Sequence, residues 1–158
     1  MKLLVFGDSH GRSRAVQRML RRAEKGTKPD LVLFAGDGLY DALDLRYEGY
    51  HVLAVRGNCD LAAPSDIPYE LTFPVNGKTI YLTHGHRLQV KQGLSLLFAR
   101  AREVDAALAI YGHTHTQTLE YREGILLLNP GALRDGGFAI VTVDDHGEMS
   151  CQLFGENE

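Results

Sequence analysis

Near its start the chain reads Lys2-Leu-Leu-Val-Phe-Gly7-Asp8-Ser9-His10-Gly11, a short apolar run that stops abruptly at glycine and polar residues. A continuous apolar run of this length, ended by glycine, is typical of a buried strand. The same pattern recurs at Leu31–Ala35, which is followed by Gly-Asp, and at His51–Val55, which is followed by Arg-Gly-Asn. The first third of the chain therefore predicts three buried strands, each ending in a polar loop.

Helical segments separate these strands. Residues 12–25 carry apolar side chains at helical spacing, and residues 40–48 can form a shorter helix. Strands that alternate with helices predict βαβ units and a parallel sheet. In the second half we expect a helix over 93–102 and strands over 69–73, 79–83, 107–111, 116–121, 124–128, 138–143 and 149–154. Asn76-Gly77 and residues 144–147 predict hairpin turns between neighbouring strands.

The composition predicts one globular domain over residues 1–158. The chain is 44% hydrophobic and its formal net charge is −3, from 17 basic and 20 acidic residues. This balance excludes collagen-like and disordered classes, and without a long basic stretch it argues against stable nucleic-acid binding. The apolar runs are far shorter than the roughly 20 residues of a membrane span, and no secretory signal pattern is evident. We therefore expect a cytoplasmic protein without a membrane partner.

Five of the apolar runs end in clusters that contain potential metal ligands. They are Gly7-Asp8-Ser9-His10-Gly11, Gly36-Asp37-Gly38, Gly57-Asn58-Cys59-Asp60, Thr83-His84-Gly85-His86 and Gly112-His113-Thr114-His115. In open α/β sheets, sites form beyond the carboxyl ends of the strands. We therefore expect the five loops to converge on one edge of the sheet.

The number of these ligands predicts a centre with two metal ions. Seven side chains qualify, namely Asp8, His10, Asp37, Asn58, His84, His113 and His115. Seven are too many for one ion but suit two ions that share a carboxylate, for which Asp37 is the natural bridge. In an extended loop, residues i and i+2 point the same way, so each Asp-x-His or His-x-His pair can reach one site. Imidazole and carboxylate ligands favour Mn, Fe, Ni, Co or Zn over Mg or Ca.

Each ligand taken alone has a simpler interpretation. Asp8 or Asp37 could cap the following helix, His113 could end a strand, and Asn58 could form a turn. The simpler interpretation of the whole set requires five strand ends to collect metal-binding residues by accident. The ordered set therefore favours a metal centre.

In these motifs the chain resembles the calcineurin-like metallophosphoesterase superfamily, and in its length and its Gly57-Asn58-Cys59-Asp60 variant the small prokaryotic YfcE-type phosphodiesterases. The resemblance implies an αββα sandwich of two packed, mixed β-sheets flanked by helices. It implies one metal ion bound by Asp8, His10, Asp37 and His115, and a second bound by Asp37, Asn58, His84 and His113. It also implies Mn or Ni as the active metal, with Mn as our expectation.

The sequence departs from the family pattern at Cys59. Many relatives carry histidine there, as the proposed acid for the leaving group. The thiol of Cys59 is a weaker proton donor at neutral pH, so it could be a buried filler, a weak acid or substrate contact, or a redox-sensitive residue. His86 could protonate the leaving group or lie in an outer shell, and Asp60 could orient a ligand or form a turn. Arg12, Arg56 and Arg87 flank the motifs and could contact phosphate or solvent.

We therefore expect a metal-dependent phosphodiesterase that acts on a small or nucleotide-like phosphodiester and could form a homo-oligomer. The alternatives are a phosphomonoesterase or nuclease of the same superfamily, and a non-catalytic metal-binding scaffold. A retromer subunit of similar fold represents the scaffold class, with its ligands replaced. Here all seven ligand positions are filled, which favours the enzyme.

Overall fold

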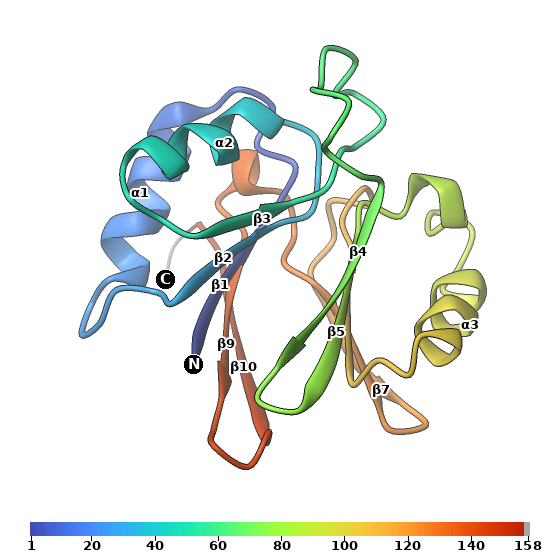
Figure 1. The fold of residues 1–158 in the computed structure, drawn as a ribbon. Coiled ribbons are helices and arrows are strands. Elements are labelled where there is room, and N and C mark those ends of the chain that lie inside the picture. Colours follow the sequence, from blue (N-terminus) through green and yellow to red (C-terminus); the bar gives the residue numbers. More distant parts are fainter. Residues whose placement is uncertain (157–158) are drawn as a thin grey trace.

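The computed structural model describes residues 1–156. They form two five-stranded sheets that pack face to face between helices (Figure 1). In the first sheet the strands follow the order β10-β9-β1-β2-β3. Their bounds are β1 Lys2–Phe6, β2 Leu31–Phe34, β3 Val52–Ala54, β9 Phe138–Val143 and β10 Met149–Phe154. Helices α1 (Ser13–Ala23) and α2 (Leu39–Tyr47) connect β1 to β2 and β2 to β3. β1, β2 and β3 are parallel, as predicted, and β9 joins β1 antiparallel.

The second sheet has the order β4-β5-β6-β8-β7. Its strands are β4 Glu70–Val75, β5 Lys78–Thr83, β6 Leu108–Ile110, β7 Thr118–Arg122 and β8 Ile125–Asn129. Helix α3 (Ser95–Glu103) connects β5 to β6, and those strands run parallel to each other and to β8. The structure adds two short 3₁₀ helices that the sequence did not predict, η1 (His86–Leu88) and η2 (Leu133–Asp135).

Three apolar cores separate four layers. The central core packs the inner faces of the sheets together, with Val5 and Leu33 on one side and Leu82 and Ile110 on the other. A second core buries α1 and α2 against the first sheet, and a third buries α3 against the second sheet. This arrangement confirms the αββα sandwich. Among residues 1–156, no helix is both long and apolar enough to cross a membrane.

The strand directions decide where the site lies. β1, β2 and β3 end at one end of the first sheet, and β5 and β6 end at the adjoining end of the second. The prediction of convergence at one edge of a single sheet was therefore too simple, since the loops come from both sheets. The packing of the two sheets brings these strand ends together, and the apolar runs in the sequence do not indicate how the sheets pack.

Candidate metal centre

Hydrogen bonds join four of the five loops. Within the first sheet the amide of Asp8 donates to the carbonyl of Gly36 (2.8 Å), and within the second Gly112 donates to His84 (3.0 Å). Two further bonds cross between the sheets. The amide of His113 donates to Asp8 Oδ2 (3.1 Å), and His84 Nδ1 lies 2.7 Å from the carbonyl oxygen of Ala35. The side chains of the site therefore connect the sheets where the strands end.

The loops are turns and not extended segments. Asp8, His10, Asp37, His113 and His115 all adopt positive φ, between 49° and 70°. Non-glycine residues rarely occupy this region, and such strain often accompanies functional sites. The extended loop expected at His113 and His115 is therefore replaced by a turn. The turn sends them to two neighbouring ligand groups.

The first ligand group consists of Asp8, His10 and His115, whose potential ligand atoms all lie within 4.8 Å of one another. Asp8 Oδ1 is 3.2 Å from His115 Nε2 and 3.9 Å from His10 Nε2. Asp8 Oδ1 and His10 Nε2 are both buried, and neither has a hydrogen-bond partner among residues 1–156. Buried polar atoms are normally paired, so these two fit a bound cation.

The second ligand group consists of Asp37, His84 and His113, with Asn58 beside it. His84 Nε2 lies 3.0 Å from Asn58 Oδ1, 3.3 Å from Asp37 Oδ2 and 3.2 Å from His113 Nδ1. Asp37 also lies within 4.8 Å of His10, a member of the first group. Asp37 therefore stands between the two groups, in the position predicted for a bridging ligand.

The hydrogen-bond geometry around His84 favours a positive charge in this group. The Ala35 carbonyl can only accept, so His84 Nδ1 carries a proton. His84 Nε2 then faces two oxygens, Asn58 Oδ1 and Asp37 Oδ2, that also only accept in the amide and the carboxylate. Such a convergence of lone pairs is stable only around a cation, either a second proton on His84 or a metal ion.

The pKa shifts without metal agree with this charge balance. Burial opposes the charge of His84, but its hydrogen bond with Asp37 and the nearby Asp8 raise its pKa. Burial would raise the pKa of Asp37, yet His84 outweighs it and holds that pKa well below its usual range. Burial raises the pKa of Asp8. Burial and the nearby His84 lower the pKa of His113 to about 4, so its ring is neutral and available as a ligand at neutral pH.

Asp60 is a structural anchor of the centre. Its Oδ2 accepts the amides of Gly57 (2.7 Å) and Asp37 (2.9 Å), and its Oδ1 accepts those of Gly38 (2.9 Å) and Leu39 (3.1 Å). Asp60 thus satisfies the first turn of α2, and Asp37 does not cap that helix. One carboxylate holds the loops after β2 and β3 together.

Gly57 leaves the space that Asp37 fills. A Cβ added at Gly57 would lie 2.0 Å from Asp37 Oδ1 and 2.6 Å from the Asp37 amide nitrogen.

We expect Gly57→Ala to lower Mn affinity about 10- to 100-fold, because it displaces a ligand in a tightly packed site. Calorimetric titration of the metal-free protein with Mn measures this. Gly155→Ala is the control, since a Cβ there meets nothing within 4 Å. Equal Mn affinity in Gly57→Ala and the wild type would contradict the assignment.

Cys59 adjoins Asp37 and His10, whereas His86 adjoins His84 and His113. The amide of Cys59 donates to Asp37 Oδ1 (2.8 Å), and its exposed side chain is close to His10. Burial and the nearby carboxylate of Asp37 raise the pKa of the Cys59 thiol, which keeps it protonated. The ring of His86 lies 5.4 Å from that of His84, and its buried Nδ1 has no partner among residues 1–156. Burial and His84 lower the pKa of His86.

Two of the flanking arginines contact an aromatic ring. The guanidinium groups of Arg56 and Arg87 lie 5.1 Å and 4.4 Å from the ring centre of Tyr69. Arg12 is exposed beside a small surface pocket that Arg14, Arg18 and Arg134 also line.

Two residues of the site were missed in the sequence. Arg134 Nη2 donates to His115 Nδ1 (3.1 Å), and buried Asn129 donates to the hydroxyl of Thr114 (2.9 Å) within the loop that carries the last two histidines. Asn129 ends an apolar run as the other site residues do, so that pattern could have identified it. Arg134 does not end an apolar run, so no sequence pattern identifies it. The 3₁₀ helix η2 brings it to His115, and that helix was not predicted.

Comparison with known proteins agrees with this site. Residues 1–146 match the calcineurin-like phosphoesterase superfamily domain. The probable metallophosphoesterase YsnB of Bacillus subtilis is 33% identical, over 92% of this chain and 86% of that protein. The phosphodiesterase YfcE of Escherichia coli K12 is 31% identical, over 84% of this chain and 79% of that protein. A crystal structure from Streptococcus pneumoniae, described as a predicted phosphoesterase, gives a TM-score of 0.75 at 27% identity, over 98% of this chain and 97% of that one.

These matches confirm the resemblance stated from the motifs. The family match covers nearly the whole chain, and the relatives align over most of their own length. By sequence and by fold alike, the chain belongs to the calcineurin-like phosphoesterase superfamily.

Proposed function

We propose that this protein is a phosphodiesterase that uses two divalent transition-metal ions, with Mn as the working metal. The observation that carries the proposal is the pair of adjoining ligand groups with Asp37 between them. Asp8 Oδ1 and His10 Nε2 in one group have no hydrogen-bond partner within the described residues 1–156, and lone pairs converge around His84 in the other group. Both observations support one cation in each group. The phosphodiesterase relative supports the reaction type.

In this proposal Asp8, His10, Asp37 and His115 hold one ion, and Asp37, Asn58, His84 and His113 hold the other. When bound, such a pair of ions lowers the pKa of a water and neutralises charge on the phosphoryl oxygens. The chain's own contribution is to fix the ligands before the substrate arrives. His84 is oriented by Ala35, Asp37 by the amide of Cys59, and Asp8 by the amide of His113.

The three further residues predicted to act in catalysis receive different roles. Asp60 is a positioning residue, because its carboxylate contacts only backbone amides around Asp37. Cys59 orients Asp37 through its amide and presents a protonated thiol to the substrate side. His86 lies beside His84 and His113, where its ring can donate a hydrogen bond to a phosphoryl or leaving-group oxygen. The single domain over residues 1–158, the cytoplasmic location and the homo-oligomer stay predictions, and residues 157–158 lie outside the described part.

Two p-nitrophenyl substrates test the proposal with metal-stripped protein and Mn added back. We expect bis-p-nitrophenyl phosphate, a diester, to be cleaved at least about tenfold faster than p-nitrophenyl phosphate, a monoester, and only with metal. Metal analysis of the loaded protein is expected to give about two Mn per chain.

The other outcomes identify the alternatives. A preference for the monoester would show a phosphomonoesterase. Two bound ions without turnover of either ester, under Mn, Ni, Co or Zn, would support the scaffold. A single bound ion would overturn the bridging role of Asp37.

A further inference from the structure

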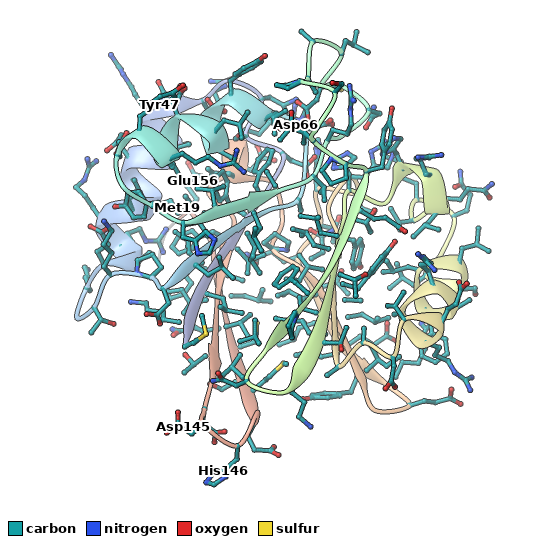
Figure 2. All side chains as sticks on the ribbon, viewed as in Figure 1. Met19, Tyr47, Asp66, Asp145, His146 and Glu156 are labelled. Carbon is teal, nitrogen blue, oxygen red and sulfur yellow. The ribbon has the colours of Figure 1, made fainter. Side chains whose placement is uncertain are left out.

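A cavity of about 400 Å³ opens directly beside the candidate metal centre. It lies between the first turn of α2 and the loop over residues 59–63, with Gly11 at its edge. Leu39, Tyr40, Leu61 and Ala62 supply much of its wall. The loop that forms this wall stands at the end of the molecule marked by Asp66, opposite the hairpin tip with Asp145 and His146 (Figure 2).

The cavity shares His10 with the first ligand group and also contacts Cys59. His10 and Cys59 line it, and their Nε2 and Sγ atoms belong to a set that lies within 4.8 Å of an oxygen of Asp37. A phosphate held at the centre would therefore extend one of its ester groups into this cavity.

The two carboxylates and the tyrosine hydroxyl of the cavity are already hydrogen-bonded to the backbone. Asp41 Oδ2 accepts the amide of Gly11 (2.9 Å), and Asp60 accepts four backbone amides. The hydroxyl of Tyr40 donates to the carbonyl of Ala62 (3.0 Å), which fixes the ring against the loop. A guest would thus find mainly apolar surface and few free hydrogen-bonding groups.

Two large apolar side chains at the cavity are exposed. Tyr40 is 55% and Leu61 is 89% exposed, the latter among the most exposed large apolar residues of the described chain. Covering such surface is favourable, and a fixed aromatic ring can also pack against another ring. A volume of about 400 Å³ is sufficient for one planar ring system.

We propose that this cavity binds a planar aromatic ester group of the substrate, next to the phosphate that is cleaved. The substrates would then be phosphodiesters that carry an aryl or nucleobase group, with Tyr40 and Leu61 determining the preference. The inference rests on the proposed phosphodiesterase function and adds the substrate class to it.

Two diesters that share a leaving group and differ in the other ester group measure the contribution of the cavity to kcat/KM. Methyl p-nitrophenyl phosphate and phenyl p-nitrophenyl phosphate are compared with Mn-loaded protein, after correction for their uncatalysed rates. We expect kcat/KM to be about tenfold or more higher for the phenyl ester. Leu61→Ser and Tyr40→Ala are expected to reduce this ratio to about twofold or less.

The control variant is Tyr47→Ala, on the same helix as Tyr40. Tyr47 is 91% exposed, is labelled in Figure 2, and does not line the cavity, so the ratio should stay at the wild-type value. Thermal unfolding confirms that each variant folds. No phenyl preference in the wild type, or an unchanged ratio in both cavity variants, would overturn the inference while leaving the phosphodiesterase intact.

Failure of the proposed function gives a different result. If neither ester is hydrolysed with any metal, the phosphodiesterase proposal fails, and the cavity is tested by binding alone. Calorimetric titration with phenyl phosphate and methyl phosphate then decides, since phenyl phosphate should bind Mn-loaded protein about tenfold more tightly. Equal affinities would overturn the inference independently of activity.

Discussion

Asp37→Asn is expected to lower kcat for bis-p-nitrophenyl phosphate by on the order of 10³-fold and to leave fewer than two Mn bound per chain. The carboxylate of Asp37 is grouped with His10 on one side and with His84 and His113 on the other. An amide keeps the shape but removes the negative charge between two cations. Stopped assays and metal analysis measure the two effects.

The fold should survive this change. Asparagine tolerates the positive φ of 63° at this position, and its amide oxygen can still accept the amide of Cys59. Asp66→Asn, in the exposed loop before β4, is the control and should match the wild type in activity and metal content. Full activity in Asp37→Asn would refute a bridging role for Asp37.

Asp60→Ala is expected to lower the free energy of unfolding by about 3 kcal/mol, because four backbone amides lose a charged acceptor. For a chain of this size the melting temperature should fall by roughly 10 °C. The loops after β2 and β3 then separate, so Mn affinity should fall as well, by about 10- to 100-fold. Thermal unfolding with and without Mn measures both effects.

Asp60→Asn and Asp66→Ala give the matched comparisons. Asp60→Asn keeps an acceptor oxygen and should lose about half as much stability, since neutral hydrogen bonds are weaker than charged ones. Asp66→Ala removes an exposed carboxylate from the same loop and should unfold like the wild type. If Asp60→Ala retained both stability and Mn affinity, Asp60 would be only a surface turn residue.

The sequence predicted the strands well because each is a short apolar run with a clear end. The run Lys2–Phe6 forms β1 with the predicted bounds, and the Asn76-Gly77 hairpin joins β4 to β5. The two 3₁₀ helices were missed, since three-residue turns leave no periodic pattern. The division of the strands between two sheets was also not visible in the residues, because the parallel pairing of β6 with β5 and with β8 depends on long-range contacts.

The site was predicted from where polar residues interrupt apolar runs. Asp8, Asp37 and His84 are buried or nearly so, and a buried carboxylate or imidazole after a strand already implies a partner. Asp60 could not be distinguished from a turn former, because three of its four amide partners lie in the loop after β2, which is remote in the chain. Arg134 was missed for the same reason, since its contact with His115 depends on how η2 packs.

What the sequence alone determined was the set of strands, the chemistry of the ligands and the loops that carry them, because these follow from local apolar runs and the residues that end them. The tertiary structure alone decided that loops from two sheets meet and that the loop carrying His113 and His115 is a turn with positive φ at both histidines. It also decided that a cavity lined by Tyr40 and Leu61 adjoins the centre. These features arise where the two sheets pack and the connecting loops meet, and contacts between residues far apart in the chain leave no pattern in the local sequence.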